Sequence, residues 1–462
     1  MRPRRVIVIG GGLAGITAAL DCADGCAHVT LLEVRPRLGG AAYSFQRDGM
    51  WLDNGQHVFL RCCAAYRALL TRLGSEHRVR IQPRLEIPVL SPGGMRAVLR
   101  RGALPAPLHL TGALMRYSYL TPAQRLSAAR AALALGQLDP RAATGTLGEW
   151  LAKHGQDSAA VAALWDLIAL PTLNLSAAEA SLALGVFVLR TGLLERNDAG
   201  DIGFHMRPLR ETLGEPAQRV LGEAGVEVRL GVRAERVERA EGADAVGADV
   251  AVPRARSHAR GSDSERNTDG LRVRANGVEI EADAVVCAVP HERASALLEP
   301  LLGAEARRWT GLGESPIVNV HVVYDRPVCD LPFAAGVGTP VQYVFDRTAA
   351  AGLSEGQYLA ISLSGADREM ECPSEQLRER YLTALSELFP RAQDAVVHSF
   401  QVTREHAATF RAKPGTEKLR PASGTDVPGL ALAGAWTDTG WPATLEGAVL
   451  SGHAAAREVL GR

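Results

Sequence analysis

The sequence carries no net charge, because its 51 Lys and Arg residues are balanced by 51 Asp and Glu residues. A chain without excess charge lacks the overall field that attracts nucleic acid or anionic lipid. Aromatic residues make up only 5% of the chain, which disfavours stacking platforms for single-stranded nucleic acid. We therefore expect no nucleic-acid partner.

Two further absences concern the compartment. The seven cysteines are odd in number and form no C-x-x-C pair, which favours unpaired thiols in a reducing cytoplasm. No run of 18 apolar residues occurs, so we expect no membrane-spanning helix. The 462 residues suffice for a large core without a disulfide or a metal ion, and we expect no metal site.

A glycine pattern stands close to the N-terminus. Gly10-x-Gly12-x-x-Gly15 follows a β-branched apolar run and opens a helical pattern of small residues. Gly10 permits the tight turn, Gly12 lets the backbone approach a pyrophosphate, and Gly15 lets the helix pack on the strand. The first turn of that helix offers N–H donors to phosphate groups, including those of Leu13 and Ala14. The pattern predicts a dinucleotide-binding βαβ unit.

Glu33 ends the second strand of this predicted unit, eighteen residues beyond Gly15. A carboxylate at this place accepts hydrogen bonds from ribose hydroxyl groups. The same carboxylate repels a 2′-phosphate group, which argues against NADP. The spacing alone does not distinguish NAD from FAD.

The next motif, Glu33-x-x-x-Arg37-x-Gly39-Gly40, resembles the signature of amine-oxidase and phytoene-desaturase flavoproteins. Two adjacent glycines let the loop run close to a diphosphate, while Arg37 offsets its charge. No second glycine-rich fingerprint follows, so a separate nicotinamide domain is not indicated. The resemblance implies that FAD is the cofactor and that Val232 covers its adenine. A valine in a strand is also an ordinary core residue.

The C-terminal segment offers a second clamp on the same cofactor. Residues 430–448 have the pattern of a strand, a glycine turn and a helix, with Gly434 in the turn. Thr444 is the expected N-cap of the helix, whose positive end would stabilise negative charge on reduced flavin. Ala443 and Leu445 flank this cap and complete the predicted contacts.

Three segments narrow the resemblance. Residues 53–58 (DNGQHV), 171–174 (PTLN) and 436–448 (WTDTGWPATLEGA) look like the squalene-associated FAD-dependent desaturases, a family better described as hydroxysqualene dehydroxylases. The likeness spans nearly the whole chain apart from one long loop. It implies that the DNGQHV segment passes the flavin, where Gly55 and Gln56 bind the cofactor.

Two positions depart from the family pattern. Arg usually follows the glycine pair, where this chain has Ala41, and Asp usually follows the Ala-Gly of the C-terminal strand, where it has Ala435. Related proteins use both side chains to contact FAD, and each lost hydrogen bond is typically worth about 0.5–1.5 kcal/mol. We still expect FAD to bind, with Asp438 as a candidate substitute contact.

The chemistry of the family implies reductive removal of an allylic hydroxyl group from a long apolar isoprenoid, giving squalene. Such a step needs a proton donor near the leaving oxygen and a water-poor cavity. His57 and Asp53 are the titratable candidates for catalysis on the flavin segment. A packing role for His57 and a loop-ordering role for Asp53 also fit the sequence. The sequence identifies no electron donor.

Two other functions stay open from the sequence. One is a different FAD enzyme, either a carotenoid desaturase of the phytoene type or a flavin amine oxidase. The other is a non-catalytic flavin-binding partner in a terpenoid assembly, a hypothesis prompted by Ala41 and Ala435. Product analysis separates the enzymes. Bleaching of the flavin absorbance by substrate separates an enzyme from a binding protein.

The pattern and the resemblance predict an α/β fold, in which a Rossmann-type FAD-binding domain of the glutathione-reductase kind carries an inserted α+β substrate-binding domain. The expected FAD-binding parts are residues 1–83, 206–295 and 401–462, with a disordered loop at 238–270. The expected substrate-domain parts are a mainly helical segment at 84–205 and a sheet at 296–400.

Two apolar stretches of the helical segment, residues 103–120 and 182–194, are too short to span a bilayer. One hypothesis is that they form a tunnel mouth on the membrane, so that the protein is cytoplasmic and peripheral on the inner face. The side chains expected to enter the lipid are Met115, Tyr117, Tyr119, Phe187 and Leu193. Ordinary core helices are the alternative.

Overall fold

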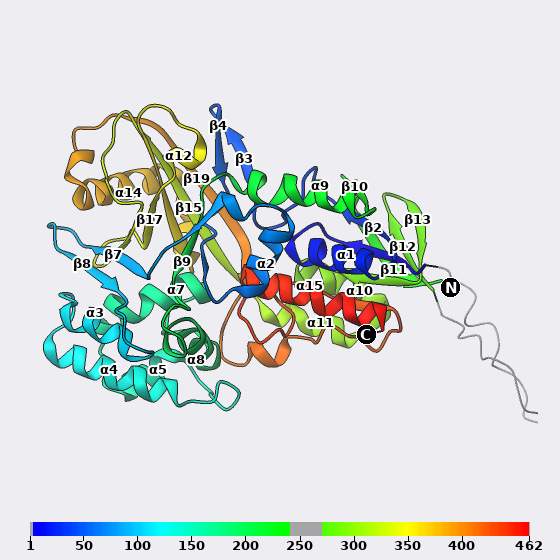
Figure 1. Cartoon of the computed structure of the whole chain (residues 1–462), viewed down its shortest axis with the longest axis horizontal. Coiled ribbons are helices and arrows are strands. Elements are labelled where there is room, and N and C mark those ends of the chain that lie inside the picture. The colour runs from blue at the N-terminus through cyan, green and yellow to red at the C-terminus, as the bar shows by residue number, and fades with distance from the viewer. Residues whose placement is uncertain (1–2, 241–269, 462) are drawn as a thin grey trace, which may run out of the picture.

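The computed structural model describes residues 3–240 and 270–461. Figure 1 shows two lobes along the long axis of the molecule, with both chain ends in one lobe and the middle of the chain in the other. Among the described residues, every helix is too short or too polar to cross a bilayer.

A five-stranded parallel sheet forms the centre of the first lobe, in the order β10-β2-β1-β14-β20. Its strands are β1 (Arg5–Ile9), β2 (His28–Glu33), β10 (Glu227–Leu230), β14 (Ala284–Cys287) and β20 (Leu430–Leu432). Parallel strands need crossover connections, and the two longest, residues 34–226 and 288–429, carry the second lobe. This arrangement confirms the predicted α/β class with a Rossmann-type sheet.

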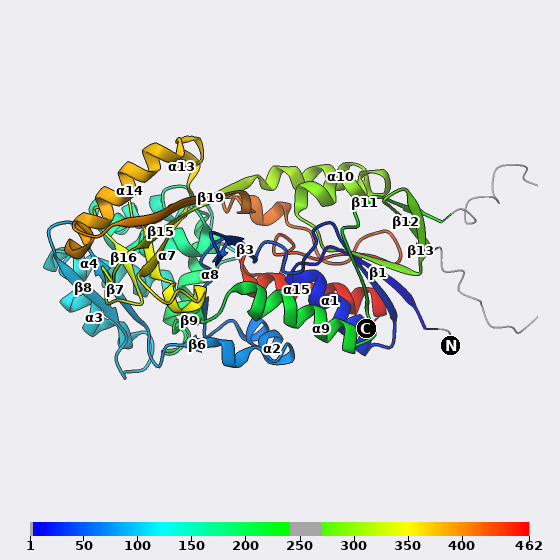
Figure 2. The same cartoon turned by 90° about the horizontal axis from the view of Figure 1, so that it is seen from above.

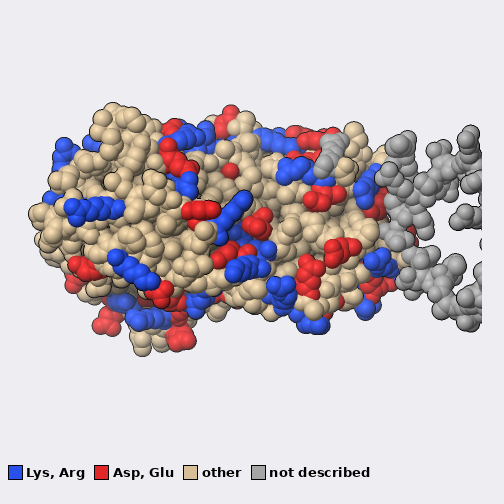
Figure 3. Space-filling model, turned by 90° about the horizontal axis from the view of Figure 1, so that it is seen from below, with Lys and Arg blue, Asp and Glu red and all other residues tan. Residues whose placement is uncertain are grey.

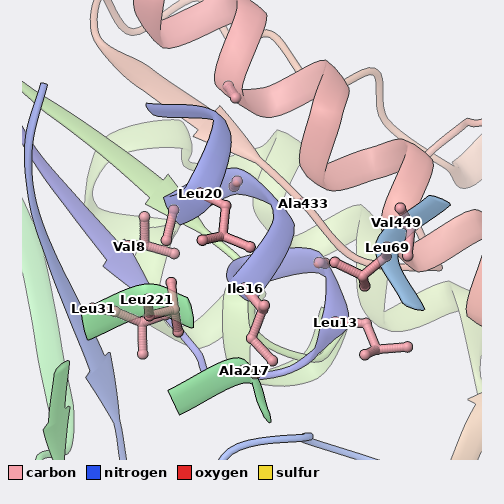
Figure 4. Close-up of a cluster of buried hydrophobic side chains, with 14 of the residues drawn as sticks. Val8, Leu13, Ile16, Leu20, Leu31, Leu69, Ala217, Leu221, Ala433 and Val449 are labelled. Carbon is pink, nitrogen blue, oxygen red and sulfur yellow. The ribbon is translucent and has the colours of Figure 1, made fainter. Parts of the chain in front are cut away.

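Side chains of β1 alternate between the two buried faces of this sheet. Val6 and Val8 join the cluster on one face, which is covered by α1 (Leu13–Asp24), α2 (Ala64–Arg72), α9 (Glu215–Glu223) and α15 (Leu445–Leu460). Figure 4 shows Val8 in this cluster near Leu20 of α1. Ile7 and Ile9 join the cluster on the other face, which is covered by β11 (Ala234–Arg239), β12 (Leu271–Ala275), β13 (Val278–Ala282), α10 (His291–Leu302) and α11 (Ala304–Arg308). Figure 2 shows α10 on the opposite side of β1 from α1 and α15.

A seven-stranded sheet forms the core of the second lobe, in the order β19-β15-β18-β17-β16-β7-β8. Its strands are β7 (Glu86–Leu90), β8 (Arg96–Arg100), β15 (Glu314–Tyr324), β16 (Phe333–Gly336), β17 (Tyr343–Asp346), β18 (Gln357–Ser364) and β19 (Val397–Phe410). Val320 and Ile361 of this sheet pack on Tyr381 of α14 (Ser374–Leu388). The short helices α12 (Thr348–Ala351) and α13 (Asp367–Glu371) lie beside it.

The helical segment packs against the β7 end of that sheet through Val89 and Ala335. Its helices are α3 (Thr111–Arg116), α4 (Pro122–Gly136), α5 (Leu147–Lys153), α6 (Ser158–Ala160), α7 (Asp166–Leu173) and α8 (Leu182–Leu189). Capping boxes at Thr121 and Thr146 begin α4 and α5. Residues 84–205 also contain β7, β8 and β9 (Ile202–His205). β7 pairs with β16, more than 200 residues later, so a local pattern could not reveal it.

Two small sheets lie between the N-terminal unit and the helical segment. One pairs β3 (Ser44–Arg47) with β4 (Met50–Asp53), and the other places β9 between β5 (Phe59–Leu60) and β6 (Val79–Ile81). The expected disordered loop at 238–270 begins inside β11, which continues to Arg239. The rest of that expectation, residues 241–269, lies outside the described residues.

Helices α1 and α15 pack in direct backbone contact. A Cβ atom at Gly452 of α15 would lie 2.4 Å from the Ala14 carbonyl oxygen and 2.7 Å from Thr17 Cβ. A Cβ atom at Gly15 would lie 1.9 Å from the Gly10 carbonyl oxygen. Because real Cβ atoms do not approach backbone this closely, only glycine fits at Gly15 and Gly452. The two glycines therefore fix how the N-terminal and C-terminal segments stack on the sheet.

We expect the substitution Gly452→Val to destabilise the first lobe by about 2–3 kcal/mol, because overpacking against backbone cannot relax by side-chain rotation. Urea unfolding followed by circular dichroism measures the change. Gly222→Val in α9 is the matched control, since a Cβ atom at Gly222 meets nothing within 4 Å. Equal stability of the two variants would contradict the proposed role of the close contact.

Candidate active site

The phosphate-binding turn joins β1 to α1. Gly10 has φ +109°, a conformation that favours glycine. Gly12 is the N-cap of α1 and provides no side-chain cap, so first-turn N–H groups, which have no partner inside the helix, stay available. These are the amides of Leu13, Ala14 and Gly15. The turn thus offers donors and the positive end of a helix to an anion.

Glu33 lies at the end of β2 directly beneath this turn. Its carboxylate is buried and accepts the N–H groups of Gly11 at 2.6 Å and Arg35 at 2.7 Å. A carboxylate offers about four acceptor positions, so two remain for hydroxyl groups. The backbone N–H of Val232 donates to the Glu33 carbonyl oxygen at 2.9 Å. Val232 is therefore held beside the residue predicted to bind ribose.

The glycine pair of the next loop lies against the same turn. Gly39 donates its N–H to the Gly11 carbonyl oxygen, and a Cβ atom at Gly40 would lie 2.7 Å from Gly12 Cα. Arg37 donates to the Gly40 carbonyl oxygen at 3.2 Å and stacks 3.6 Å above the Tyr43 ring. Burial lowers the pKa of Arg37.

The C-terminal segment meets the turn from the other side. Gly434 lies two residues after β20, with φ +142°, and donates its N–H to Ser451 Oγ of α15 at 2.8 Å. Thr444 is the N-cap of α15 and accepts the N–H of Gly447 at 3.1 Å, as predicted. Ala443 and Leu445 beside it are half-buried. Predicted contacts from both chain ends therefore flank the α1–α15 pair.

The structure places the two departures from the family pattern differently. Ala41 is exposed and Ala435 is half-buried. Arg420 is buried and donates to the carbonyl oxygens of Ala435, Trp436 and Thr437, and burial lowers its pKa to about 10. Asp438 is exposed and accepts the N–H of Gly440 at 3.2 Å. Its substitute contact to FAD stays a prediction.

The DNGQHV segment leaves β4 and carries polar groups into the interior. Gln56 Nε2 and Asn319 Oδ1 are buried and have no hydrogen-bond partner among the described residues. A Cβ atom at Gly55 would lie 3.5 Å from Asn319 Nδ2 and 3.4 Å from His57 Nε2. Because buried polar atoms are normally paired, Gln56 and Asn319 indicate a polar ligand beside Gly55.

Asn54 organises this segment. Its Nδ2 donates to the Ala41 carbonyl oxygen at 2.9 Å and to Glu405 Oε1 at 3.1 Å. Its Oδ1 accepts the N–H of Tyr43 at 3.0 Å and lies 3.3 Å from His57 Nε2. An amide oxygen can only accept, so the network assigns the proton of neutral His57 to Nε2 and leaves Nδ1 unprotonated.

His57 lies at a small internal cavity between the two lobes. The cavity is lined by Asp53, Gln56, His57, Val58, Phe204, His205, Leu209, Phe345 and Arg347. Burial lowers the pKa of His57 to about 4 and that of His205 to about 3. Both imidazoles are neutral at pH 7, and His205 Nε2 lies 2.8 Å from the Tyr66 hydroxyl.

Asp53 forms a buried ion pair with Arg347, at 2.9 Å from Oδ2 to Nη2. Its Oδ1 accepts the Ser44 hydroxyl at 2.6 Å and the Leu209 N–H at 2.9 Å. Burial raises the pKa of Asp53, and Arg347 opposes that rise. Arg347 also donates to the His205 carbonyl oxygen. Asp53 and His57 thus share one cavity, where Asp53 is fully engaged by protein groups.

Two tryptophans of the C-terminal motif and one tyrosine of the apolar stretch 103–120 have packing roles. Trp436 is buried, donates to the Val289 carbonyl oxygen at 2.9 Å and packs on Trp309. Trp441 packs edge-on against Phe187, with ring centroids 5.2 Å apart. Tyr117, expected to enter lipid, is fully buried. Its hydroxyl donates to the Ala163 carbonyl oxygen at 2.6 Å.

The residues of both chain ends and of the DNGQHV segment fit FAD. An uncapped helix start suits the pyrophosphate, and the buried carboxylate of Glu33 suits the ribose. The orphaned Gln56 amide and Asn319 oxygen suit the polar edge of a flavin. The residues that would hold FAD are Gly10, Gly12, Leu13, Ala14, Gly15, Glu33, Arg37, Gly39, Gly40, Gly55, Gln56, Val232, Gly434, Ala443, Thr444 and Leu445.

Four residues of the site were not predicted from the sequence: Asn54, Asn319, Arg347 and Arg420. Asn54 lies within the DNGQHV motif, so its position could have marked it. Asn319 and Arg347 lie more than 200 residues from their hydrogen-bonding partners in the site. Arg420 sits in a segment without a motif. No local signal distinguishes these three residues.

Comparison with known proteins agrees with this site. A family model described as flavin containing amine oxidoreductase matches residues 13–460. Because the match covers nearly the whole chain, the protein belongs to that family. The cyclohexylamine oxidase of Brevibacterium oxydans has the same fold, with a TM-score of 0.70, 17% identity and 99% coverage of both chains.

The chain is also similar over its full length to two kinds of isoprenoid enzyme. The hydroxysqualene dehydroxylase of Rhodopseudomonas palustris is 29% identical over 99% of this chain and 98% of its own length. The zeta-carotene desaturase of Synechocystis sp. is 25% identical over 99% of this chain and 97% of its own length. The resemblance to hydroxysqualene dehydroxylases is thereby confirmed, and the protein is an FAD-dependent oxidoreductase.

We expect Glu33→Ala to weaken FAD binding about 10-fold or more, since hydrogen bonds to a charged acceptor are worth about 1.5–3 kcal/mol. The ratio of flavin to protein absorbance after purification, and titration of apoprotein with FAD, measure the effect.

The matched control is Glu227→Ala on the neighbouring strand β10. Glu227 is exposed and pairs with Arg229, so FAD binding should stay as in the wild-type protein. Equal FAD affinity of the Glu33→Ala variant and the wild type would exclude Glu33 from the cofactor site.

Proposed function

We propose that this oxidoreductase reductively removes the allylic hydroxyl group of hydroxysqualene to give squalene. The observation that carries the proposal is the full-length similarity to proteins named hydroxysqualene dehydroxylase in three organisms, at 25–29% identity. The DNGQHV segment at the cavity supports it, because that segment is one of those that carry the resemblance to the same family. Amine oxidases of known structure share the fold alone, at under 25% identity.

The proposed reaction breaks the allylic carbon–oxygen bond and forms a carbon–hydrogen bond at that carbon. One proton is consumed, and the oxygen leaves as water. Reduced FAD, when bound, supplies the two electrons and the hydrogen of the new bond. The protein must therefore deliver a proton to the leaving oxygen and keep water away from the allylic carbon.

His57 is the residue that we assign to the leaving oxygen. It borders the cavity, and Asn54 holds its Nε2 proton at 3.3 Å, leaving Nδ1 to carry the exchangeable proton. A protonated imidazole with a pKa of about 4 is a stronger acid than histidine in water. It therefore transfers its proton readily to a departing hydroxyl group.

Asp53 and Arg347 are positioning residues in this proposal. Their ion pair joins the end of β4 to the residue that follows β17, on two sides of the cavity. Phe204, Leu209 and Phe345 form part of the apolar wall of this small cavity and limit the access of water. The substrate class rests on the names of the relatives.

Carotenoid desaturation is the second candidate, because zeta-carotene desaturases are similar over the full chain. Anaerobic incubation of the reduced enzyme with hydroxysqualene, followed by mass spectrometry, separates the two. Squalene is the expected product. Absence of squalene together with turnover of phytoene or zeta-carotene by the oxidised enzyme would establish the desaturase instead.

We expect His57→Gln to lower turnover about 100-fold, in the range typical of general acid catalysis, while FAD stays bound. In the wild-type enzyme, the protonated fraction of a group with a pKa near 4 rises with falling pH. Turnover should therefore increase by up to about tenfold per unit between pH 8 and 6, and the variant should lose this dependence. Product formation under single-turnover conditions measures both.

His28→Gln is the control, because His28 is exposed at the start of β2. It should keep both the rate and the pH profile. A His57→Gln enzyme with an unchanged pH profile would remove His57 from the proton transfer, even if its rate fell.

A further inference from the structure

Exposed apolar side chains gather at one end of the second lobe. Among the described residues, seven of the eleven exposed large hydrophobic side chains lie within residues 95–133. Their exposed fractions run from 44% to 59%, and they are Met95, Val98, Leu104, Leu108, Met115, Leu126 and Leu133. We call these seven residues the apolar end patch. Scattered apolar exposure is normal on a protein surface, whereas a concentration of this kind marks an interaction site.

The elements that carry the apolar end patch adjoin one another. Helix α3 packs against both β8 and α4. Arg125 of α4 donates to the Met115 carbonyl oxygen at 2.7 Å, and the Tyr119 hydroxyl donates to the Met95 carbonyl oxygen at 2.7 Å. Figures 1 and 2 show β8, α3 and α4 at the end of the molecule opposite the chain termini.

Helix α4 is apolar on two sides. Ala128, Ala131 and Leu135 are buried against the lobe, while Leu126 and Leu133 point outward with 53% and 54% exposed. A surface helix of a protein in water normally has a polar outer face. The outer side chains of α4 are therefore not an edge of the core but a second apolar face.

The same stretch has a one-sided charge. Residues 87–138 contain six Arg and no Asp, Glu or Lys, although the whole chain has equal numbers of both signs. Arg96, Arg116 and Arg130 are exposed and form no ion pair within the described residues. Arg130 lies between Leu126 and Leu133 on one face of α4. Figure 3 shows blue side chains on a mainly uncharged surface at this end.

The positive charge of this stretch distinguishes two candidate partners of the apolar end patch, a second copy of the chain and a lipid bilayer. In a symmetric dimer the patch would face its own copy, and arginines without acidic partners would then oppose arginines. A bilayer with anionic headgroups supplies both an apolar interior and the missing negative charge. The absence of acidic residues over this stretch thus favours lipid over a second copy.

We propose that the apolar end patch, together with Arg96, Arg116 and Arg130, binds the surface of a bilayer that contains anionic lipids. Apolar side chains such as Leu108 and Met115 enter the acyl region, and the three guanidinium groups lie at phosphate level. The purpose of such binding rests on the proposed function, because the isoprenoid substrate of that function dissolves in the bilayer. The inference differs from the expectation, based on the balanced total charge, that the chain lacks an overall field attracting anionic lipid.

The test is flotation of the FAD-loaded protein with vesicles of phosphatidylcholine alone, or with about 30% phosphatidylglycerol. We expect flotation with the mixed vesicles, weakened by about 0.5 M salt. Replacing Arg96, Arg116 and Arg130 with Gln should weaken binding about 5-fold for each arginine. The double variant Leu108→Ser and Met115→Ser should weaken it about 10-fold or more.

Control variants make the same chemical changes elsewhere on the surface. Val278→Ser and Val396→Ser alter side chains that are 62% and 55% exposed, and Arg308→Gln removes an exposed arginine of α11. All three should float like the wild type. Because the readout is vesicle binding and not turnover, failure of the proposed function leaves this inference standing, and the reverse also holds.

Three results would overturn the inference. One is equal flotation with neutral and anionic vesicles, and another is flotation that neither set of patch variants weakens. The third is a dimer in sedimentation velocity that the Leu108→Ser and Met115→Ser changes dissociate, without any vesicle binding. Turnover of detergent-dispersed substrate should be the same in patch variants and wild type, since the patch residues lie outside the cavity.

Discussion

The close contact between α1 and α15 is the constraint on which the rest of the molecule depends. The Ala14 carbonyl oxygen leaves no room for a side chain at Gly452, so two helices from opposite ends of the chain share one layer. Their N-terminal ends, at Gly12 and Thr444, belong to the two segments that we predict to bracket FAD. The second lobe can be inserted in the middle of the chain because this contact closes the first lobe independently of it.

Local constraints explain what the sequence reveals. Gly10 favours glycine because its own φ angle is positive, and Gly15 must be glycine because of the Gly10 carbonyl oxygen five residues away. Glu33 is marked by its distance from them. Such local requirements leave short sequence motifs, and from these motifs the first lobe and its FAD cofactor can be predicted. The pairing of β7 with β16 and the clamp of Arg420 on Ala435 depend on other parts of the fold, and no motif encodes them.

The direction of a side chain is a further non-local property. Tyr117 and Met115 lie two residues apart in one apolar stretch, yet one is fully buried and the other is 59% exposed. Composition marks the stretch as apolar but not which side faces a neighbour, because that depends on how α3 docks on β8 and α4. The same limit applies to Trp436, because its motif does not reveal that its ring packs in the core against Trp309.

The Asp53–Arg347 ion pair fixes the geometry of the cavity that contains His57. Burying two charges costs several kcal/mol of hydration, on the order of what their attraction returns, so the pair is a weak source of stability. Ser44, Leu209 and the His205 carbonyl group saturate it and fix its geometry. A saturated pair at the cavity holds the end of β4 beside the end of β17 without offering a mobile charge. Neutral His57, beside it, has its Nε2 proton held by Asn54 and an unprotonated Nδ1, which is the atom that can take up and pass on a proton.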